Sequence, residues 1–104
     1  RRKFEKEILV KTHGEYPDAV KAVGKAEKVA VVDMESKSAA VLTRYGKDGS
    51  TKLFLQLKPG EHPNYPKGVE DNTHFSPLGA EEMARLAVEG IRENKIKLTK
   101  YLKK

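Results

Sequence analysis

The sequence predicts an α/β domain with a parallel sheet, and it predicts that this chain supplies only part of that sheet. Val29–Met34 is the clearest strand, and its run is continuously apolar rather than alternating, which is typical of a strand covered on both faces. Three or four helical segments accompany this strand, whereas no second strand is equally clear. Since a parallel strand needs neighbouring strands, we expect the missing ones to come from another segment or another chain.

The elements before and after this strand follow from short-range patterns. The apolar run Ile8–Val10 predicts a short strand or an irregular edge. A helix is expected over Tyr16–Lys28, because apolar residues recur at helical spacing and Pro17 stands at a tolerated early position. A second helix is expected from Ser36 to Tyr45, and it ends near Gly46.

The second half of the chain contains the longest irregular stretch and the best-defined helix. The segment Thr51–Leu57 fits a short helix or a strand, and its pattern favours the helix. Lys58–Asn72 is expected to be a loop, because it contains three prolines and two glycines. Ser76 and Pro77 fit the N-cap and first position of a helix. This helix has one apolar stripe, which consists of Met83, Leu86, Ala87, Gly90 and Ile91.

The composition sets limits on the class of protein. A chain of 104 residues forms one domain at most, and 38% hydrophobic with 35% charged residues suits a solvated surface. No apolar run approaches the ~20 residues that a membrane-spanning helix needs, so we expect no membrane partner. The absence of cysteine excludes disulfides, thiolate nucleophiles and cysteine-ligated zinc, but it leaves the cell compartment open.

The net charge of +6 comes from the ends of the chain. Of the 21 basic residues, three open the chain and five lysines lie within residues 95–104. The part between contains the other 13 basic residues and all 15 acidic residues. The body is therefore slightly acidic. We expect residues 95–104 to form a solvated basic tail rather than a nucleic-acid interface, because Tyr101 alone is a poor platform for stacking bases.

The candidate catalytic residues are Asp71 and His74, which lie at the end of the predicted loop and just before the last helix. A histidine can take and return a proton near neutral pH, and a carboxylate on its Nδ1–H fixes the tautomer. Two other interpretations remain open at this point. Asp71 could cap backbone amides beside an exposed His74, or both could bind a divalent ion together with His62.

A general base needs a nucleophile, and none is evident. The four serines are Ser36, Ser38, Ser50 and Ser76, and none lies in a Gly-x-Ser-x-Gly motif. Ser50 belongs to a turn between charged residues, and Ser76 is better explained as a helix cap. We therefore expect the nucleophile to lie outside this chain.

The stretch from Gly68 to Ala80, which contains Asp-x-x-His-Phe-Ser-Pro-Leu-Gly-Ala, resembles the last conserved block of the GDSL/SGNH hydrolases, and most closely the rhamnogalacturonan acetylesterases. Residues 59–66 and the segments Arg1–Phe4 and Thr12–Pro17 are also similar to that group. The resemblance covers the chain to about Arg92 and corresponds to the C-terminal half of such an enzyme. Residues 1–94 would then be the C-terminal portion of an SGNH hydrolase domain.

The resemblance implies a three-layer α/β/α flavodoxin-like fold with a parallel sheet, of which the N-terminal half is missing here. It implies that His74 is the general base and Asp71 its partner in an acetylesterase that acts on pectic polysaccharide without a metal or other cofactor. His62, Asn64 and Tyr65 would contact the sugar. The serine and the oxyanion hole would come from a complementary N-terminal segment or chain, and this chain alone would be inactive. The alternative hypotheses are a non-catalytic basic binding module and an inactive interaction domain.

Overall fold

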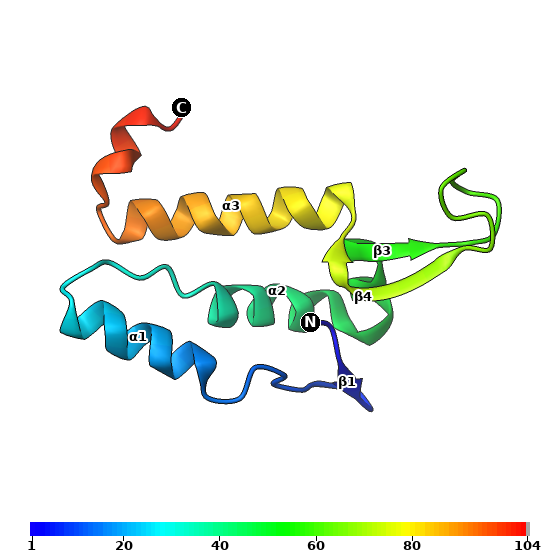
Figure 1. The fold of residues 1–104 in the computed structure, drawn as a ribbon, viewed down its shortest axis with the longest axis horizontal. Helices are drawn as coiled ribbons and strands as arrows, with labels where there is room; N and C mark the ends of the chain where they lie inside the picture. Colours follow the sequence, from blue (N-terminus) through cyan, green and yellow to red (C-terminus); the bar gives the residue numbers. More distant parts are fainter. Residues whose placement is uncertain (104) are drawn as a thin grey trace.

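The computed structural model describes residues 1–103, and Figure 1 shows its helices beside a projecting β-hairpin. Lys104, the last residue of the expected basic tail, lies outside the described residues. The elements in order are β1 (Phe4–Glu5), β2 (Ile8–Leu9), α1 (Tyr16–Ala26), α2 (Met34–Gly49), the 3₁₀ helix η1 (Ser50–Leu53), β3 (Phe54–Leu57), β4 (Val69–Phe75), α3 (Pro77–Glu93) and the 3₁₀ helix η2 (Lys97–Tyr101).

The expected parallel sheet is not formed by the described residues. Two antiparallel pairs occur instead: β1 with β2, and β3 with β4. Both pairs join segments that are close in sequence, and antiparallel strands can be connected by a short loop, whereas parallel strands need a long crossover.

The predicted strand Val29–Met34 is likewise not a strand in this structure. Met34 begins α2, and the preceding residues run without a partner strand between α1 and α3 (Figure 1). Both faces of this segment nevertheless contact helices. Val31 packs against Gly24 of α1, where an added Cβ would lie 2.2 Å from Val31 Cγ2, and Val32 packs in the same way against Gly90 of α3. These contacts cover the segment only in part, because Val29 is 63% exposed and no residue from 29 to 33 is buried. The ladder of a sheet needs a neighbouring strand, and residues 1–103 provide none.

The hydrophobic core lies at the other end of the helices. Its buried members come from α2, η1, β3 and α3, and they are Val41, Leu42, Leu53, Phe54, Met83 and Leu86. Leu53 is fully buried, and the first turn of α3 lies directly on its backbone, because a Cβ at Gly79 would be 1.8 Å from Leu53 O. The start of α3 is therefore fixed against the end of η1.

The hairpin of β3 and β4 corrects two sequence predictions. Phe54–Leu57 is a strand preceded by one 3₁₀ turn, and the end of the predicted loop is the strand β4. In the register, Phe54 lies opposite Phe75 and Leu57 opposite Val69, and the rings of Phe54 and Phe75 have centroids 5.3 Å apart. Phe54–Leu57 is a strand because β4 provides a cross-strand partner, and the local sequence pattern does not reveal such a partner.

The helix predictions agree closely with the structure. Helix α1 begins at Tyr16, and α2 departs from helical geometry at Gly46, where φ is +77°. Helix α3 begins at Pro77, and the Ser76 side chain accepts a hydrogen bond from Gly79 N, as expected of an N-cap.

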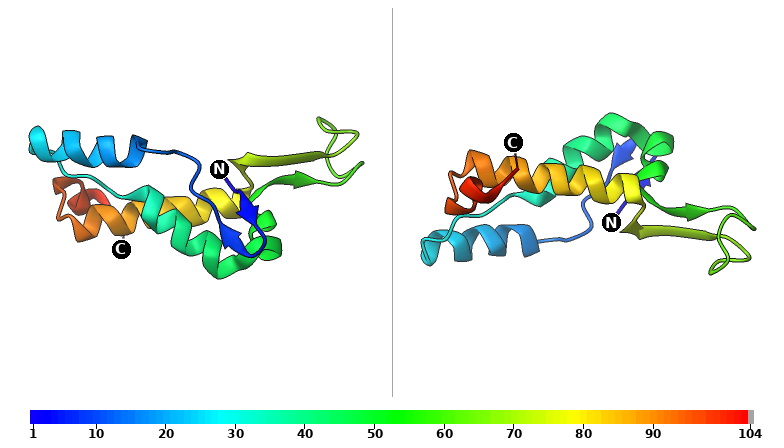
Figure 2. Two further views of the ribbon diagram at one scale, coloured as in Figure 1. Left: turned by 90° about the horizontal axis from the view of Figure 1, so that it is seen from below. Right: turned by 90° about the horizontal axis from the view of Figure 1, so that it is seen from above.

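The overall shape is extended rather than spherical, as the views in Figure 2 show. The radius of gyration is 16.2 Å, whereas a compact domain of this length is expected near ~13 Å. Helix α1 leaves large apolar side chains in solvent: Val20 is 57% exposed and Val23 is 61% exposed. Apolar residues at helical spacing normally cover a core, so this face of α1 lacks its covering layer.

Candidate active site

Asp71 and His74 form a tight turn within β4, immediately before the cap of α3. Asp71 Oδ1 accepts hydrogen bonds from the backbone amides of Thr73 at 2.6 Å and His74 at 2.8 Å. Asp71 Oδ2 lies 2.8 Å from His74 Nδ1. One carboxylate therefore fixes both the backbone of the turn and the orientation of the imidazole. The pair is held locally and needs no contact from another domain.

The three hydrogen bonds also determine the charge of the carboxylate. The pKa of Asp71 is lowered from 3.8 to about 2, mainly by the His74 backbone amide and then by the Thr73 amide and the His74 ring. Asp71 is thus ionised at neutral pH and can only accept hydrogen bonds. Nδ1 of His74 must then carry the proton, and in the neutral ring Nε2 keeps its lone pair.

The imidazole is open to solvent. The His74 side chain is 75% exposed, whereas that of Asp71 is 25% exposed. The carboxylate is therefore sheltered while the exposed imidazole can reach another group, which is what a general base with an orienting acid would require. The capping interpretation of Asp71 is confirmed for the backbone, because its carboxylate accepts the amides of Thr73 and His74. The general-base interpretation of His74 stays a prediction.

The four serines all have structural hydrogen bonds. Ser36 Oγ donates to Asp33 Oδ2 and Ser38 Oγ to Glu35 O, both within α2 or its cap. Ser76 Oγ donates to Lys52 O at 2.6 Å while it caps α3. Ser50 is fully buried and donates to Lys47 O. In the described part of the chain, no serine hydroxyl is hydrogen bonded to His74.

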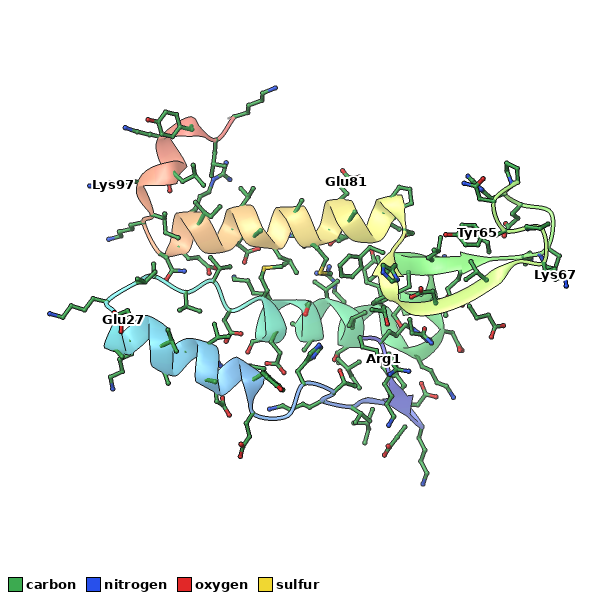
Figure 3. The ribbon with its side chains drawn as sticks, viewed as in Figure 1. Arg1, Glu27, Tyr65, Lys67, Glu81 and Lys97 are labelled. Carbon is green, nitrogen blue, oxygen red and sulfur yellow. The ribbon has the colours of Figure 1, made fainter. Side chains whose placement is uncertain are left out.

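His62, Asn64 and Tyr65, the predicted sugar-contacting residues, lie together at the tip of the hairpin. Asn64 N donates to His62 Nδ1 at 3.1 Å, and the rings of His62 and Tyr65 have centroids 6.0 Å apart. The structure does not bring them to His74. The five-residue step from Val69, beside the tip, to His74 corresponds to roughly 16 Å of extended strand. Figure 3 shows Tyr65 on the arm that projects away from the helices.

A metal site is not evident in residues 1–103, where no group of three histidine, aspartate or glutamate side chains is placed to bind an ion. The third ligand of the alternative interpretation, His62, is at the hairpin tip and therefore remote from Asp71 and His74.

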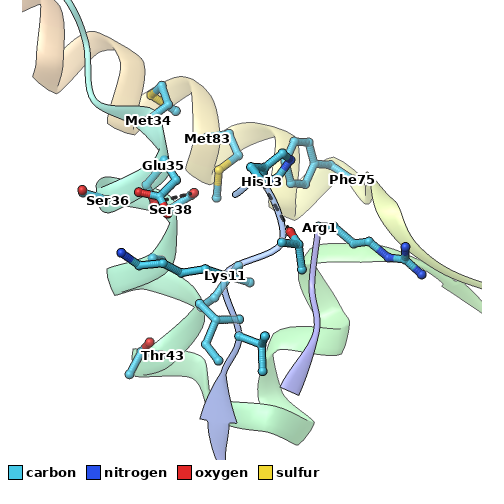
Figure 4. Close-up of a pocket in the computed structure, with 15 residues that line it drawn as sticks. Arg1, Lys11, His13, Met34, Glu35, Ser36, Ser38, Thr43, Phe75 and Met83 are labelled. Carbon is cyan, nitrogen blue, oxygen red and sulfur yellow. Dashed lines mark hydrogen bonds between the residues drawn. The ribbon is translucent and has the colours of Figure 1, made fainter. Parts of the chain in front are cut away.

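The structure has a cavity of about 640 Å³, whose lining residues are drawn in Figure 4. It is formed by Arg1, by β2 and the segment that follows it, by α2 as far as Thr43, and by one side chain each from β4 and α3. Its lining is Arg1, Leu9, Val10, Lys11, Thr12, His13, Met34, Glu35, Ser36, Ser38, Ala39, Leu42, Thr43, Phe75 and Met83. His74 is not in this lining, but the next residue, Phe75, is.

Three residues around the turn were not predicted as part of the site. Arg2 was given a terminal charge and a place in the family-like segment Arg1–Phe4. Gln56 was part of an ambiguous segment, and Asn72 was part of the family-like block Gly68–Ala80, without a role of its own. Both Arg2 Nη1, at 2.9 Å, and Gln56 Nε2, at 3.0 Å, donate to Asn72 Oδ1. Sequence gives no local signal for such contacts, because Arg2 and Asn72 are 70 positions apart.

No helix in the described residues is long and apolar enough to cross a membrane.

The described residues thus contain a hydrogen-bonded Asp–His pair with an exposed imidazole, and a cavity that is lined in part by the neighbouring Phe75. This arrangement fits one part of a hydrolytic site.

Two curated proteins of Bacillus subtilis (strain 168) are similar to the chain. Rhamnogalacturonan acetylesterase RhgT is 47% identical over 103 residues, which cover 98% of this chain and 44% of that protein. Probable rhamnogalacturonan acetylesterase YesY is 30% identical over 99 residues, which cover 95% of this chain and 42% of that protein. The chain spans less than half the length of either relative. No family model matches it, and no solved structure does.

Proposed function

We propose that this chain, which resembles the rhamnogalacturonan acetylesterases over 98% of its length, supplies the histidine and aspartate of a carbohydrate esterase site. The observation that carries the proposal is the 2.8 Å contact between Asp71 Oδ2 and Nδ1 of an exposed His74. The substrate class follows from the relatives' names: an acetylated pectic polysaccharide such as rhamnogalacturonan.

The proposed reaction is acyl transfer through a serine that a complementary N-terminal segment provides. His74 Nε2 takes the serine proton while the serine oxygen attacks the acetyl carbonyl carbon. Asp71 stabilises the imidazolium, and oxyanion donors on the complementary segment stabilise the tetrahedral intermediate. The proton then passes to the departing sugar hydroxyl. Water attacks the acetyl-enzyme with His74 again as the base, and acetate leaves.

The requirement for a complementary segment is supported by the open parts of the fold. Residues 29–32 have a helix on each face but no strand beside them, and within residues 1–103 the amides of Ala30, Val31 and Val32 have no backbone acceptor. Adding parallel strands there would satisfy these amides and form the three-layer α/β/α fold. The same addition would cover the apolar face of α1.

The division of the chain is part of the same proposal. Residues 1–94 form the C-terminal portion of the SGNH hydrolase domain, and residues 95–104 form a basic tail that follows α3. This tail includes the short helix η2, in which Lys100 Nζ lies 4.8 Å from the ring centre of Tyr101.

The hairpin tip is proposed to contact sugar at a distance from the reacting ester. His62 and Tyr65 present two rings on a projecting arm, and a polymeric substrate can extend from His74 to that arm. The proposal therefore separates the residues that act on the acetyl group from those that contact the polymer. Truncation of Tyr65 should raise KM for polysaccharide and leave the hydrolysis of a small acetyl ester unchanged.

A chimera gives the direct test of the esterase proposal. This chain would replace the 103 matched residues of the Bacillus subtilis relative RhgT, and acetate release from acetylated rhamnogalacturonan would be measured. We expect the chimera to be active and the 104-residue chain alone to be inactive. His74→Ala should lower kcat by about 10²–10⁴-fold, the usual contribution of a general base. A folded chimera without activity, or activity that survives His74→Ala, would refute the proposal.

A further inference from the structure

Arg2 joins the candidate turn to the packed end of the molecule. Its guanidinium donates from Nε to Ser50 Oγ at 2.8 Å and from Nη1 to Asn72 Oδ1 at 2.9 Å, and Nη2 donates to the carbonyl of Lys47. The backbone amide of Arg2 also donates to Asn72 O at 2.8 Å. Asn72 is thus held through both its side chain and its backbone.

The other side of this contact is anchored at a buried residue. Ser50 is fully buried at the junction of α2 and η1, and its hydroxyl donates to Lys47 O while it accepts from Arg2. Lys47 lies in the last turn of α2 and Ser50 is its C-cap, and α2 contributes Val41 and Leu42 to the core. A side chain that is bonded to this junction is therefore held in a defined position relative to the core.

Asn72 is the residue through which the turn can be positioned. It follows Asp71 directly, and a second donor, Gln56 of β3, bonds both Asn72 Oδ1 and Asp71 O at 3.0 Å. The contacts within the turn set the orientation of the imidazole relative to Asp71, but they do not set where the turn lies relative to the rest of the domain. Arg2 and Gln56 supply that second constraint.

We propose that Arg2 is a positioning residue, which acts through Asn72 to place His74 for proton transfer. The inference depends on the proposed esterase function and adds a specific remote residue to it. A planar guanidinium can serve three acceptors at once in fixed directions, whereas the point charge of lysine cannot reproduce that geometry. Small displacements of a catalytic group, about 1 Å, can lower rates by about a hundredfold.

A double-mutant cycle in the active chimera tests this proposal. Arg2→Gln should lower kcat by about tenfold to a hundredfold and leave KM within about twofold, because positioning affects the reacting group rather than polymer binding. Asn72→Ala should have a similar effect. If Arg2 acts through Asn72, Arg2→Gln should cause less than about a twofold further loss in the Asn72→Ala background. Arg2→Lys should not restore kcat.

Arg44→Gln is the matched control. Arg44 is an exposed arginine of α2 whose nearest carboxylate contact in the described chain is Glu82 Oε2 at 4.0 Å, and its loss should leave kcat unchanged. An unchanged kcat in Asn72→Ala, or Arg2 and Asn72 effects that multiply independently, would overturn the proposal. Asn72→Ala leaves the bonds of Arg2 to Ser50 and Lys47 in place, so it decides the question even if Arg2→Gln fails to fold.

A spectroscopic measurement separates this inference from the esterase proposal. Residual dipolar couplings of the backbone amides of residues 71–74 report the orientation of the turn relative to the helices of the chimera, whether or not the chimera hydrolyses ester. We expect Arg2→Gln to change these couplings and Arg44→Gln to leave them unchanged. An inactive chimera in which Arg2→Gln still changes them refutes the esterase proposal alone. Unchanged couplings in a folded Arg2→Gln chimera refute the positioning role.

Discussion

The two ends of this molecule differ in how completely they are packed. At the packed end, which comprises α2, η1, β3, β4 and the start of α3, six hydrophobic side chains are buried together and the Asp71–His74 turn is fixed by hydrogen bonds. At the open end, which comprises α1 and residues 27–33, only Gly24 of the helix is buried and the valines of α1 face solvent. The turn thus lies on the end that is structurally complete, while the end that lacks a covering layer is where we propose that the rest of the enzyme adds.

The largest effect on stability should come from the packed end. Leu53→Ala removes a fully buried side chain, and it should lower the free energy of unfolding by about 2–5 kcal/mol because a cavity remains. Urea denaturation of the chimera measures this loss. A change below 1 kcal/mol would show that the packed end is not the core of the domain.

The cap of α3 should have a smaller effect. Ser76→Ala removes the acceptor for Gly79 N and the donor to Lys52 O, and it should cost about 1 kcal/mol. Ser76→Asp keeps a capping acceptor and is the matched control, with a smaller expected loss in the same denaturation experiment. Equal losses in the two variants would mean that the cap does not stabilise α3.

A substitution at the open end should destabilise the chimera more than the isolated chain. Val23→Ala should change the unfolding free energy of the isolated chain by less than 0.5 kcal/mol, since surface substitutions rarely exceed that. In the chimera it should cost about 1 kcal/mol, because added segments would bury the side chain. Equal effects in both proteins would contradict a covering role for the N-terminal segment. Val20→Ala, on the same exposed face, should behave in the same way.

The smallest expected effect is that of pH on the stability of the Asp71–His74 turn. The pKa of Asp71 is lowered to about 2, so its stabilising contribution is complete above the ordinary value of 3.8 and is lost as the pH falls toward 2. Near neutral pH no change is expected. The ¹³Cγ chemical shift of Asp71 measures this titration, and Asp71→Asn should abolish it. A midpoint at or above 3.8 would show that the amides of Thr73 and His74 do not bind the carboxylate.

Local signals were sufficient for the helices and for the Asp–His turn. The helix boundaries depend on the backbone geometry of a few neighbouring residues, and they lie at or near Pro17, Gly46, Ser76 and Pro77. The Asp-x-x-His spacing is equally local, and the structure places Asp71 Oδ2 and His74 Nδ1 2.8 Å apart. The catalytic role of the pair stays a prediction, as do the sugar contacts of His62, Asn64 and Tyr65.

The sequence by itself determined which segments are apolar, where the helices begin and that one short turn contains an aspartate and a histidine. Tertiary structure decided everything that depends on a distant partner. Phe54–Leu57 became a strand because β4 pairs with it. Residues 29–32 stayed unpaired because no strand within residues 1–103 lies beside them, and Arg2 reached Asn72 across 70 positions. The physical reason is that helical hydrogen bonds close within four residues, whereas strands and side-chain clamps form only where the fold supplies the other half of each bond.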